Sequence, residues 1–169
     1  MAETAKVGAN TCPECGQPGK SVATKTLKHM VQPQHLGRVN QPGFRFCRSA
    51  DCEVVYFHPV GECLRKPDLR VRVGLKETED PVPICYCFGF TEAMAVEEIR
   101  TTGKCTIPQR ITAEVKAGNC ACEIRNPQGS CCLGNVNAVV GRLPKSLPSE
   151  SVSPRTDPAL ARSASSASC

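Results

Sequence analysis

The stretch Cys12-Pro13-Glu14-Cys15-Gly16 (CPECG) decides the fold of the N-terminal part of this chain. Two cysteines separated by two residues place two thiolates on one tight turn, where both can reach the same metal ion. The glycine that follows lets the backbone fold back, so that amide N–H groups can hydrogen-bond to the sulfur atoms. The sequence therefore predicts one half of a metal site at this turn.

A second pair of cysteines follows in the segment Cys47-Arg-Ser-Ala-Asp-Cys52, after 31 intervening residues. The residues directly behind it, EVVYFH (53–58), are β-branched and aromatic and are typical of a strand that would support the site. Four sulfur ligands in a closed tetrahedral site suit structural zinc. We therefore predict that Zn²⁺ is bound by Cys12, Cys15, Cys47 and Cys52.

Three alternatives exist for these cysteines. His58 or Cys63 could replace one of the four ligands. Cys12 and Cys15 alone could form a thioredoxin-type redox pair, but that motif needs a βαβ context, and here Pro18, Gly19 and polar residues follow. Cys47 and Cys52 could be small buried apolar residues, although charged neighbours flank both of them.

Six further cysteines fall within 48 residues, in the pairs Cys85-Tyr-Cys87, Cys120-Ala-Cys122 and Cys131-Cys132. A [2Fe-2S] cluster needs four thiolates, two for each iron, and a CxC pair can serve one side of it. Cys85 and Cys87 precede one predicted helix and Cys132 opens another, so helix N-termini would direct N–H groups toward an anionic cluster. A second closed zinc site is the alternative for this region.

Helical periodicity marks the C-terminal half. A helix is predicted from Thr91, its N-cap, through Thr101, with Gly103 ending it. A second helix begins near Ile107 and Pro108 and ends at Gly118, and a third runs over Leu133–Val140 and is capped by Gly141. The first half shows short strands and turns instead. In Leu69–Leu75 apolar residues alternate with arginines, which predicts a half-buried strand.

These patterns predict an α+β chain in four parts. Residues 1–9 are expected to be disordered, and 10–82 to form a zinc-binding β module with a linking strand. Residues 83–143 are expected to form a small helical [2Fe-2S]-binding domain. The stretch 144–169 is rich in Ser, Pro and Ala and has almost no large apolar residues, a composition typical of a disordered tail.

The composition indicates that this chain relies on bound metal for part of its folding stability. The 169 residues include 13 cysteines but no tryptophan, five phenylalanines and two tyrosines, so large side chains supply little core. No signal-peptide or membrane-spanning run is present, which favours a cytoplasmic protein with reduced thiols over a disulfide framework. The net charge of +5 comes from interleaved charges without aromatic neighbours, so we expect neither nucleic acid nor membrane as a partner.

At these residues the chain resembles a known family. The blocks ICYCFGFTEAM and CEIRNPQGSCCLGNV resemble the [2Fe-2S] domain of the bacterioferritin-associated ferredoxin type. The blocks CPECG and FCRSADCEVVYF resemble the zinc module that precedes that domain in the CopZ-type copper chaperone family. The resemblance covers roughly residues 10–143. It implies a protein that holds both zinc and a [2Fe-2S] cluster and is tied to copper handling.

The resemblance also implies a ligand set for the cluster. Cys85 and Cys87 match the first two family ligands, Cys122 the third and Cys132 the fourth, which gives CxC-x34-C-x9-C. The simpler ferredoxins close with a CxxC pair, so this chain departs from them, and Cys120 and Cys131 are rivals for the last two positions. Cys105 and Cys169 have no assigned role.

For function, the sequence favours one-electron transfer or redox sensing in metal homeostasis, with copper as the expected metal. No MxCxxC copper-carrying loop follows residue 143, and no catalytic triad, phosphate-binding loop or GxGxxG motif is present, so at most outer-sphere reduction of a metal ion is expected. Copper ions, or a copper transporter or chaperone, are the expected partners. Two alternatives are a non-redox module that docks on a transporter or storage protein, and a Cu(I) carrier that uses the spare thiols Cys120, Cys131 and Cys105.

Overall fold

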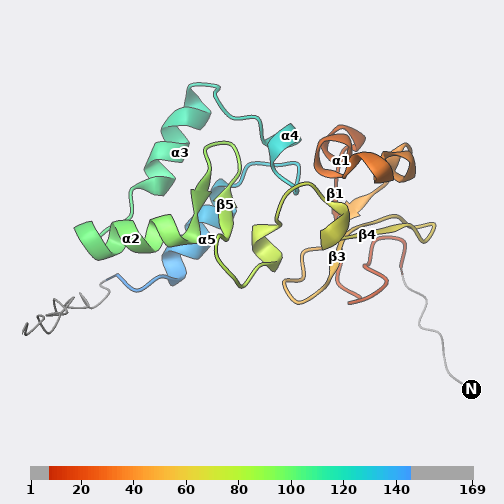
Figure 1. The fold of residues 1–169 in the computed structure, drawn as a ribbon, viewed down its shortest axis with the longest axis horizontal. Coiled ribbons are helices and arrows are strands. Elements are labelled where there is room, and N and C mark those ends of the chain that lie inside the picture. Colours follow the sequence, from red (N-terminus) through yellow and green to blue (C-terminus); the bar gives the residue numbers. More distant parts are fainter. Residues whose placement is uncertain (1–7, 146–169) are drawn as a thin grey trace, which may run out of the picture.

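The protein is described here from a computed structural model, which describes residues 8–145 and combines helices with strands (Figure 1). Residues 1–7 and 146–169, which contain most of the two ends predicted to be disordered and also Cys169, lie outside the described residues. In chain order the elements are β1 (Lys20–Ser21), α1 (Thr24–Met30), the 3-10 helix η1 (Pro33–Val39), β2 (Arg45–Phe46), β3 (Val54–Phe57), β4 (Cys63–Arg65), the 3-10 helices η2 (Lys66–Asp68) and η3 (Gly74–Lys76), β5 (Pro83–Cys85), β6 (Phe90–Thr91), α2 (Glu92–Thr102), α3 (Ile107–Lys116), α4 (Cys122–Arg125) and α5 (Leu133–Arg142).

A four-stranded antiparallel sheet in the order β1-β2-β3-β4 forms the N-terminal half. Its best-formed strand is β3, the predicted run of β-branched and aromatic residues, and all four of its residues are buried. In the antiparallel register Phe46 of β2 lies opposite Tyr56 of β3, and their rings meet edge to face at 6.0 Å. The aromatic residues of this short chain are therefore concentrated where the sheet covers its core.

One core lies on α1 and η1, and a smaller one is built around cysteines. The larger cluster joins Leu27 and Met30 of α1 to Phe44, Phe46 and other buried residues of the sheet. The smaller cluster combines Val54 and Phe57 of β3 with Cys12, Cys47 and Cys52. Since cysteine side chains supply much of the second cluster, the integrity of this half of the sheet depends on what those sulfurs bind.

The C-terminal half packs helices α2, α3 and α5 around the two-stranded ladder β5-β6. Thr91 caps α2 by accepting a hydrogen bond from the Met94 N–H, and Gly103 ends it with a φ of 77°. The core of this half joins Ile84, Ala95, Ile107, Ile111 and Val136 to four buried cysteines. The second cysteine set is therefore part of a hydrophobic core.

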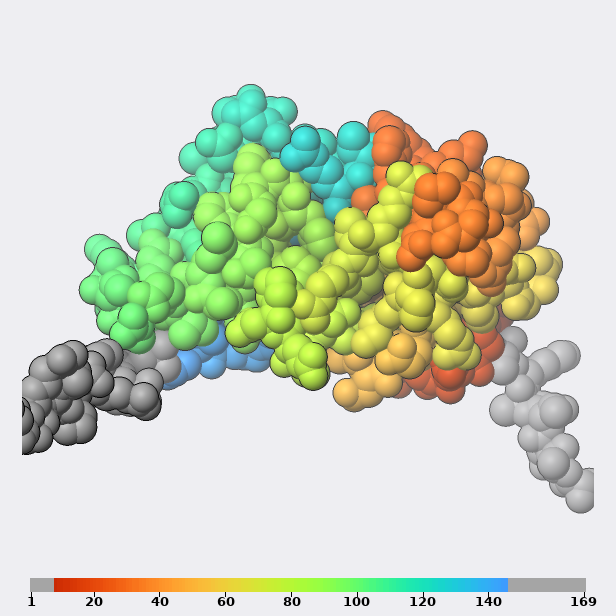
Figure 2. All heavy atoms as spheres, viewed as in Figure 1, coloured from red at the N-terminus to blue at the C-terminus, as the bar shows by residue number. Residues whose placement is uncertain are grey.

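The segment Cys122–Ser130 joins the two halves. The Thr26 hydroxyl donates to the Glu123 carbonyl at 2.7 Å, and the Tyr56 hydroxyl donates to the Pro127 carbonyl at 2.6 Å. Gly129 has a φ of 63°, and a Cβ atom there would lie 2.9 Å from the Thr26 hydroxyl, so this approach requires glycine. Figures 1 and 2 show the same contact, with the cyan α4 region directly against the orange α1.

The predicted helices are confirmed to within one or two residues at most ends. α2 and α3 begin and end near the predicted caps, and Gly118 follows α3 with a φ of 78°. The third helix is longer than predicted, because Gly141 lies inside α5 and the helix ends at Arg142. Glycine at the penultimate position of a helix is tolerated when the next residues continue the hydrogen-bonded turn.

The predicted strand over Leu69–Leu75 is wrong. This stretch follows η2, pairs only through a single bridge between Val31 and Leu69, and runs into η3. Its alternation is nevertheless a burial pattern, since Leu69 and Val73 are buried and Val71 packs against the same core. Within residues 8–145 no strand forms a hydrogen-bonded ladder with this stretch, so the alternating residues lie on the core without being part of a sheet.

Helix α1 and the 3-10 helix η1 were not predicted, because the first half was expected to contain only strands and turns. Leu27, Met30 and Val31 carry the three- and four-residue spacing of a helix, and Pro33 limits its length. A run of seven residues is too short for this signal to stand out from loops. None of the helices in residues 8–145 combines the length and apolar character that crossing a membrane requires.

We predict that Thr26→Val lowers the free energy of unfolding by about 1–3 kcal/mol, because it leaves the Glu123 carbonyl at the junction without its hydrogen bond. Urea unfolding of the metal-loaded chain, followed by circular dichroism, measures this loss. Thr24→Val is the matched control, since the Thr24 side chain makes no hydrogen bond to residues 8–145, and it should change stability by less than about 0.5 kcal/mol. Equal losses in the two variants would contradict the junction role.

Candidate metal centres

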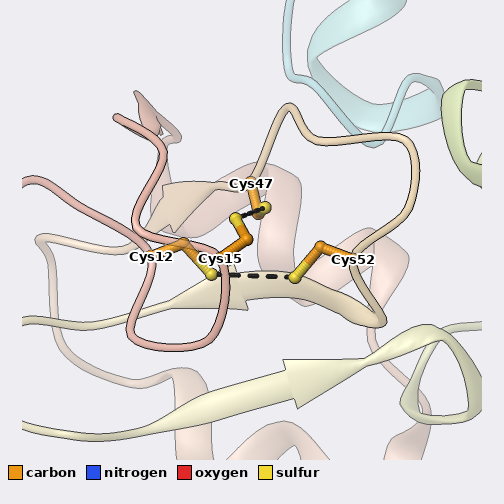
Figure 3. Close-up of side chains that lie close together, drawn as sticks. All are labelled: Cys12, Cys15, Cys47 and Cys52. Atoms are coloured by element: carbon orange, nitrogen blue, oxygen red, sulfur yellow. Dashed lines mark hydrogen bonds between the residues drawn. The ribbon is translucent and has the colours of Figure 1, made fainter.

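The first centre brings together the four cysteines predicted to bind zinc. Their sulfur atoms all lie within 4.8 Å of one another, and Figure 3 shows the side chains converging from two loops. Cys12 and Cys52 are 3.9 Å apart between sulfurs, and Cys15 and Cys47 are 3.5 Å apart. Each close pair takes one cysteine from each loop, so a single ion at the centre would join both loops.

Local backbone structure explains why each loop presents two sulfurs on one side. The N–H of Gly16 donates to the Cys12 carbonyl at 2.9 Å, and Gly16 adopts a φ of 71°, as expected for a metal knuckle that ends in glycine. The second loop lies between β2 and β3, and the Cys47 N–H donates to the Val55 carbonyl at 2.8 Å. The sheet therefore fixes one knuckle and the glycine turn shapes the other.

The four thiols of this centre differ in how readily they ionise. Burial raises the pKa of Cys47 and of Cys52 above the usual thiol value. Burial also acts to raise the pKa of Cys15, but the Gln17 N–H and the Cys47 thiol donate toward its sulfur and lower the pKa overall. Because metal binding requires thiolates, loading this centre releases protons from the buried thiols.

The donor set fits one tetrahedral ion. Four sulfurs at these separations leave no open position, which is typical of a structural zinc site and not of a catalytic one. The two alternative ligands lie elsewhere. The His58 ring stacks at 5.0 Å on Phe44, and its Nε2 lies 3.0 Å from the Pro42 carbonyl oxygen. Cys63 is half-buried beside the centre but outside the group of four.

The second set of cysteines is arranged differently. The sulfurs of Cys85 and Cys132 lie 3.1 Å apart and those of Cys87 and Cys122 lie 3.5 Å apart. All four side chains are buried. Cys85 ends β5, Cys122 begins α4 and Cys132 is the N-cap residue of α5. Two close sulfur pairs thus form within the C-terminal core.

This pairing differs from the expected one. The sequence suggested that Cys85 and Cys87 would serve one side of a cluster together, whereas the close contacts pair each of them with a cysteine from the downstream segment. Cys85 is the last residue of β5 and Cys87 lies in the turn that follows, so the strand's alternation does not extend to Cys87 and the two cysteines of the CxC meet different partners. The downstream partners are Cys122 and Cys132, and not their rivals Cys120 and Cys131.

Hydrogen bonds favour negative charge at this site. The Ala121 N–H donates to the Cys87 sulfur at 3.3 Å, and an Arg125 guanidinium N–H donates to the Cys87 carbonyl at 3.1 Å. The hydrogen bond from the Cys132 thiol lowers the pKa of Cys85 to about 6, while the same contact and burial raise the pKa of Cys132. Burial raises the pKa of Cys122 to about 12. The lowered pKa of Cys85 therefore makes it ready to bind metal as a thiolate, whereas Cys122 and Cys132 would release protons on binding.

The spare thiols are more accessible. Cys131 is exposed and Cys120 is half-buried, and both line a surface pocket of about 520 Å³ together with Lys25, Glu123 and Cys122. Cys105 lies half-buried in the turn between α2 and α3. Sequence reasoning missed two residues beside the centres. The buried Lys76 bonds to the loop of the first centre, and Tyr86 stands between Cys85 and Cys87 in the turn of the second. For Tyr86, its place within the CxC pair was the available signal.

Comparison with known proteins agrees with this description. Residues 9–70 match the model of a CopZ-type family described as a zinc binding domain. A protein named copper chaperone CopZ, from Archaeoglobus fulgidus, is 37% identical over 122 residues. Those residues make up 72% of this chain and 57% of the relative, so the chain spans a little over half the length of that curated protein.

A solved structure is also similar. The X-ray structure of the Archaeoglobus fulgidus CopZ N-terminal domain matches with a TM-score of 0.66 and 33% sequence identity. The match covers 76% of this chain and 96% of the solved chain. The similarity therefore extends beyond the zinc binding domain into the C-terminal half.

For the first centre we predict that Cys47→Ser removes bound zinc and, with it, the cooperative unfolding of the N-terminal half. A tetrahedral site that loses one of four thiolates loses most of its affinity, and that affinity is part of the folding free energy. Elemental analysis and thermal unfolding measure both effects. Cys63→Ser is the matched control and should retain zinc, and equal zinc loss in that variant would show that Cys63 is a ligand.

Proposed function

This chain belongs to the family of the CopZ N-terminal domain, and from that premise we propose that it supports copper homeostasis as a zinc protein with a [2Fe-2S] cluster that passes single electrons. Zinc at Cys12, Cys15, Cys47 and Cys52 would be structural. The cluster would be held by Cys85, Cys87, Cys122 and Cys132. The observation that carries the proposal is the division of the second four cysteines into two close sulfur pairs.

The contrast between the two centres supports this assignment. Within residues 8–145 only the first four cysteines form a group of three or more ligand atoms that all lie within 4.8 Å of one another, as one ion requires. The second four form two separate pairs at 3.1 and 3.5 Å. Two irons with two thiolates each call for that kind of arrangement, and a single zinc ion does not.

The residues around the second centre favour thiolate ligands and the negative charge that a cluster bound by thiolates would carry. Cys85, whose pKa is lowered to about 6, offers a thiolate at neutral pH. The Ala121 N–H stabilises charge on the Cys87 sulfur, and burial of Cys85 and Cys132 keeps water away from the sulfurs. When bound, a [2Fe-2S] cluster supplies one-electron transfer, the change that converts Cu(II) to the Cu(I) form that thiolates prefer.

The link to copper rests on the relatives. The A. fulgidus protein that covers this chain over 122 residues is named a copper chaperone, and its N-terminal domain is the solved structure that matches here. Copper ions, or a transporter or chaperone that carries them, are therefore the partners we propose. No catalytic group is needed for this role, because an electron can pass to the metal ion without a bond to the protein.

We predict that protein purified without oxygen contains two irons and two sulfides per chain and shows thiolate-to-iron charge-transfer bands that bleach with dithionite. The double substitution Cys122→Ala, Cys132→Ala should abolish the bands and leave zinc in place. Absorption and electron paramagnetic resonance spectroscopy, with elemental analysis, make the measurement.

The double substitution Cys120→Ala, Cys131→Ala is the matched control, because these residues are neighbours of the proposed ligands but lie outside the two sulfur pairs. It should keep the bands. A colourless wild-type protein with two zinc ions would reject the redox function and favour a module that binds partners through a structural metal.

A second candidate function is Cu(I) binding through the spare thiols. The pocket that Cys120 and Cys131 line is open to solvent, and its two thiols are not engaged in the buried pairs, so a soft ion could reach them. Glu123 and Lys25 also line the pocket and form an ion pair at 3.2 Å, so these two charges balance at its rim.

This function predicts that Cys120→Ser, Cys131→Ser loses a Cu(I) equivalent that the wild type retains against a chromogenic Cu(I) chelator. Titration under anaerobic conditions measures it, and Cys105→Ser serves as the control with one accessible thiol removed elsewhere. Unchanged Cu(I) binding in the double variant would rule out this pocket.

A further inference from the structure

Residues 72–76, which we call the strap, contact the loops of both cysteine centres. The strap runs from Arg72 through η3 and ends at Lys76. Neither metal site contains any of its residues, and the proposed function does not use them. The contacts at its two ends give it a role.

At one end Lys76 is almost fully buried, with 4% of its surface exposed. Its ammonium donates to the Ser49 carbonyl at 2.5 Å and to the Cys52 carbonyl at 3.0 Å. Both carbonyls belong to the loop that presents Cys47 and Cys52 to the first centre. The strap therefore holds the backbone of the zinc loop directly.

The charge of Lys76 has no carboxylate partner, because no salt bridge to it is present among residues 8–145. Besides the two carbonyls the ammonium lies 6.0 Å from the centre of the Phe46 ring, and a buried ammonium with such neutral partners is costly unless an anion lies close by. Four thiolates with one Zn²⁺ carry a net charge of about −2, which is the compensation that this position lacks in the metal-free chain. The Lys76 charge also favours the thiolate of Cys47.

At the other end the strap is fixed by Tyr86, the residue between Cys85 and Cys87. The Gly74 N–H donates to the Tyr86 hydroxyl oxygen at 2.8 Å, and that hydroxyl donates to the Arg72 carbonyl at 3.1 Å. Gly74 packs so closely on β5 that a Cβ atom there would lie 1.8 Å from the Pro83 carbonyl oxygen. Two hydrogen bonds and this close packing therefore join the strap to the Cys85–Cys87 turn.

We propose that the strap couples the two centres, so that zinc bound at the first centre orders the Cys85–Cys87 turn of the second. Zinc fixes the Cys47–Cys52 loop and supplies the negative charge that holds Lys76 in place. Lys76 in turn holds the strap, and Tyr86 transmits its position to the turn. This inference requires zinc at the first centre and does not depend on which metal fills the second.

The junction between α1 and α4 is a second connection between the halves, and it reaches the downstream ligands instead. Thr26 and Tyr56 bond to the segment that carries Cys122, whereas the hydroxyl of Tyr86, a residue of the upstream turn, bonds to the strap. Substitutions in the strap and in the α1–α4 junction can therefore distinguish which of the two connections couples the halves.

The test is hydrogen exchange with mass spectrometry on the full chain, free of iron, with and without Zn²⁺. Zinc should slow exchange in residues 45–55 and also, by about tenfold, in residues 84–91. Tyr86→Phe, which keeps the ring and removes only the hydroxyl, should retain zinc-dependent protection in 45–55 and lose it in 84–91. Gly74→Ala, which forces the strap away from β5, should give the same pattern.

Lys76→Met should weaken zinc protection in both segments and shift the sulfur-to-metal charge-transfer bands of the cobalt-substituted protein to lower energy, because a positive charge beside the thiolates is gone. Lys76→Arg should restore both. Lys28→Met, at an exposed lysine on α1, is the matched control and should behave as the wild type. Thr26→Val should keep the coupling.

Two outcomes would overturn the proposal. One is that zinc protects residues 45–55 of the wild type but leaves 84–91 unchanged. The other is that Tyr86→Phe and Gly74→Ala retain full protection of 84–91, which would assign the coupling to the α1–α4 junction. The inference shares the zinc at the first centre with the proposed function, but neither outcome bears on whether the second centre holds iron, so the coupling and the redox function can fail separately.

Discussion

Closure of the first cysteine centre is the constraint on which the N-terminal half depends. Cys12 and Cys15 lie on a turn near the start of the chain, and Cys47 and Cys52 lie between two strands of the sheet, so a single ion bound by all four would join segments that are distant in sequence. A structural zinc site contributes about 10–16 kcal/mol in zinc-finger peptides, comparable to the whole stability of a small domain. The smaller core that includes Val54 and Phe57 is completed by those cysteines, and apolar burial alone would leave it open.

The second centre depends on the first half for the position of two of its cysteines. Cys122 and Cys132 flank a segment whose Pro127 carbonyl is bonded to Tyr56 of the sheet and whose Gly129 fits against Thr26 of α1. These contacts need the sheet and α1 in their folded places. The helices α2, α3 and α5 supply the apolar surroundings, but the loop that carries the ligands is shaped from outside the helical half.

Sequence reasoning succeeded where the signal is local. The CPECG turn, the Thr91 cap and the Gly103 and Gly118 stops each depend on a few neighbouring residues, and the structure has them where expected. It failed where the outcome depends on distant partners. The alternation in Leu69–Leu75 indicates burial equally well with or without a neighbouring strand, and only the tertiary structure decides. The pairing of Cys85 with Cys132, and of Cys87 with Cys122, is likewise set by how α4 and α5 pack.

The same contrast between local and distant determinants explains why the cysteine sites could be predicted from the sequence and the buried charge of Lys76 could not. A CxxC or CxC motif is visible in any sequence, whereas nothing near Lys76 indicates that its ammonium is buried against the carbonyls of a metal-binding loop. A lysine in that position is stable only beside negative charge, so its burial and the thiolate character of the first centre are two aspects of one electrostatic arrangement. In this chain that arrangement also fixes the Cys47–Cys52 loop from outside the cysteines, because the Lys76 ammonium bonds to the carbonyls of both Ser49 and Cys52.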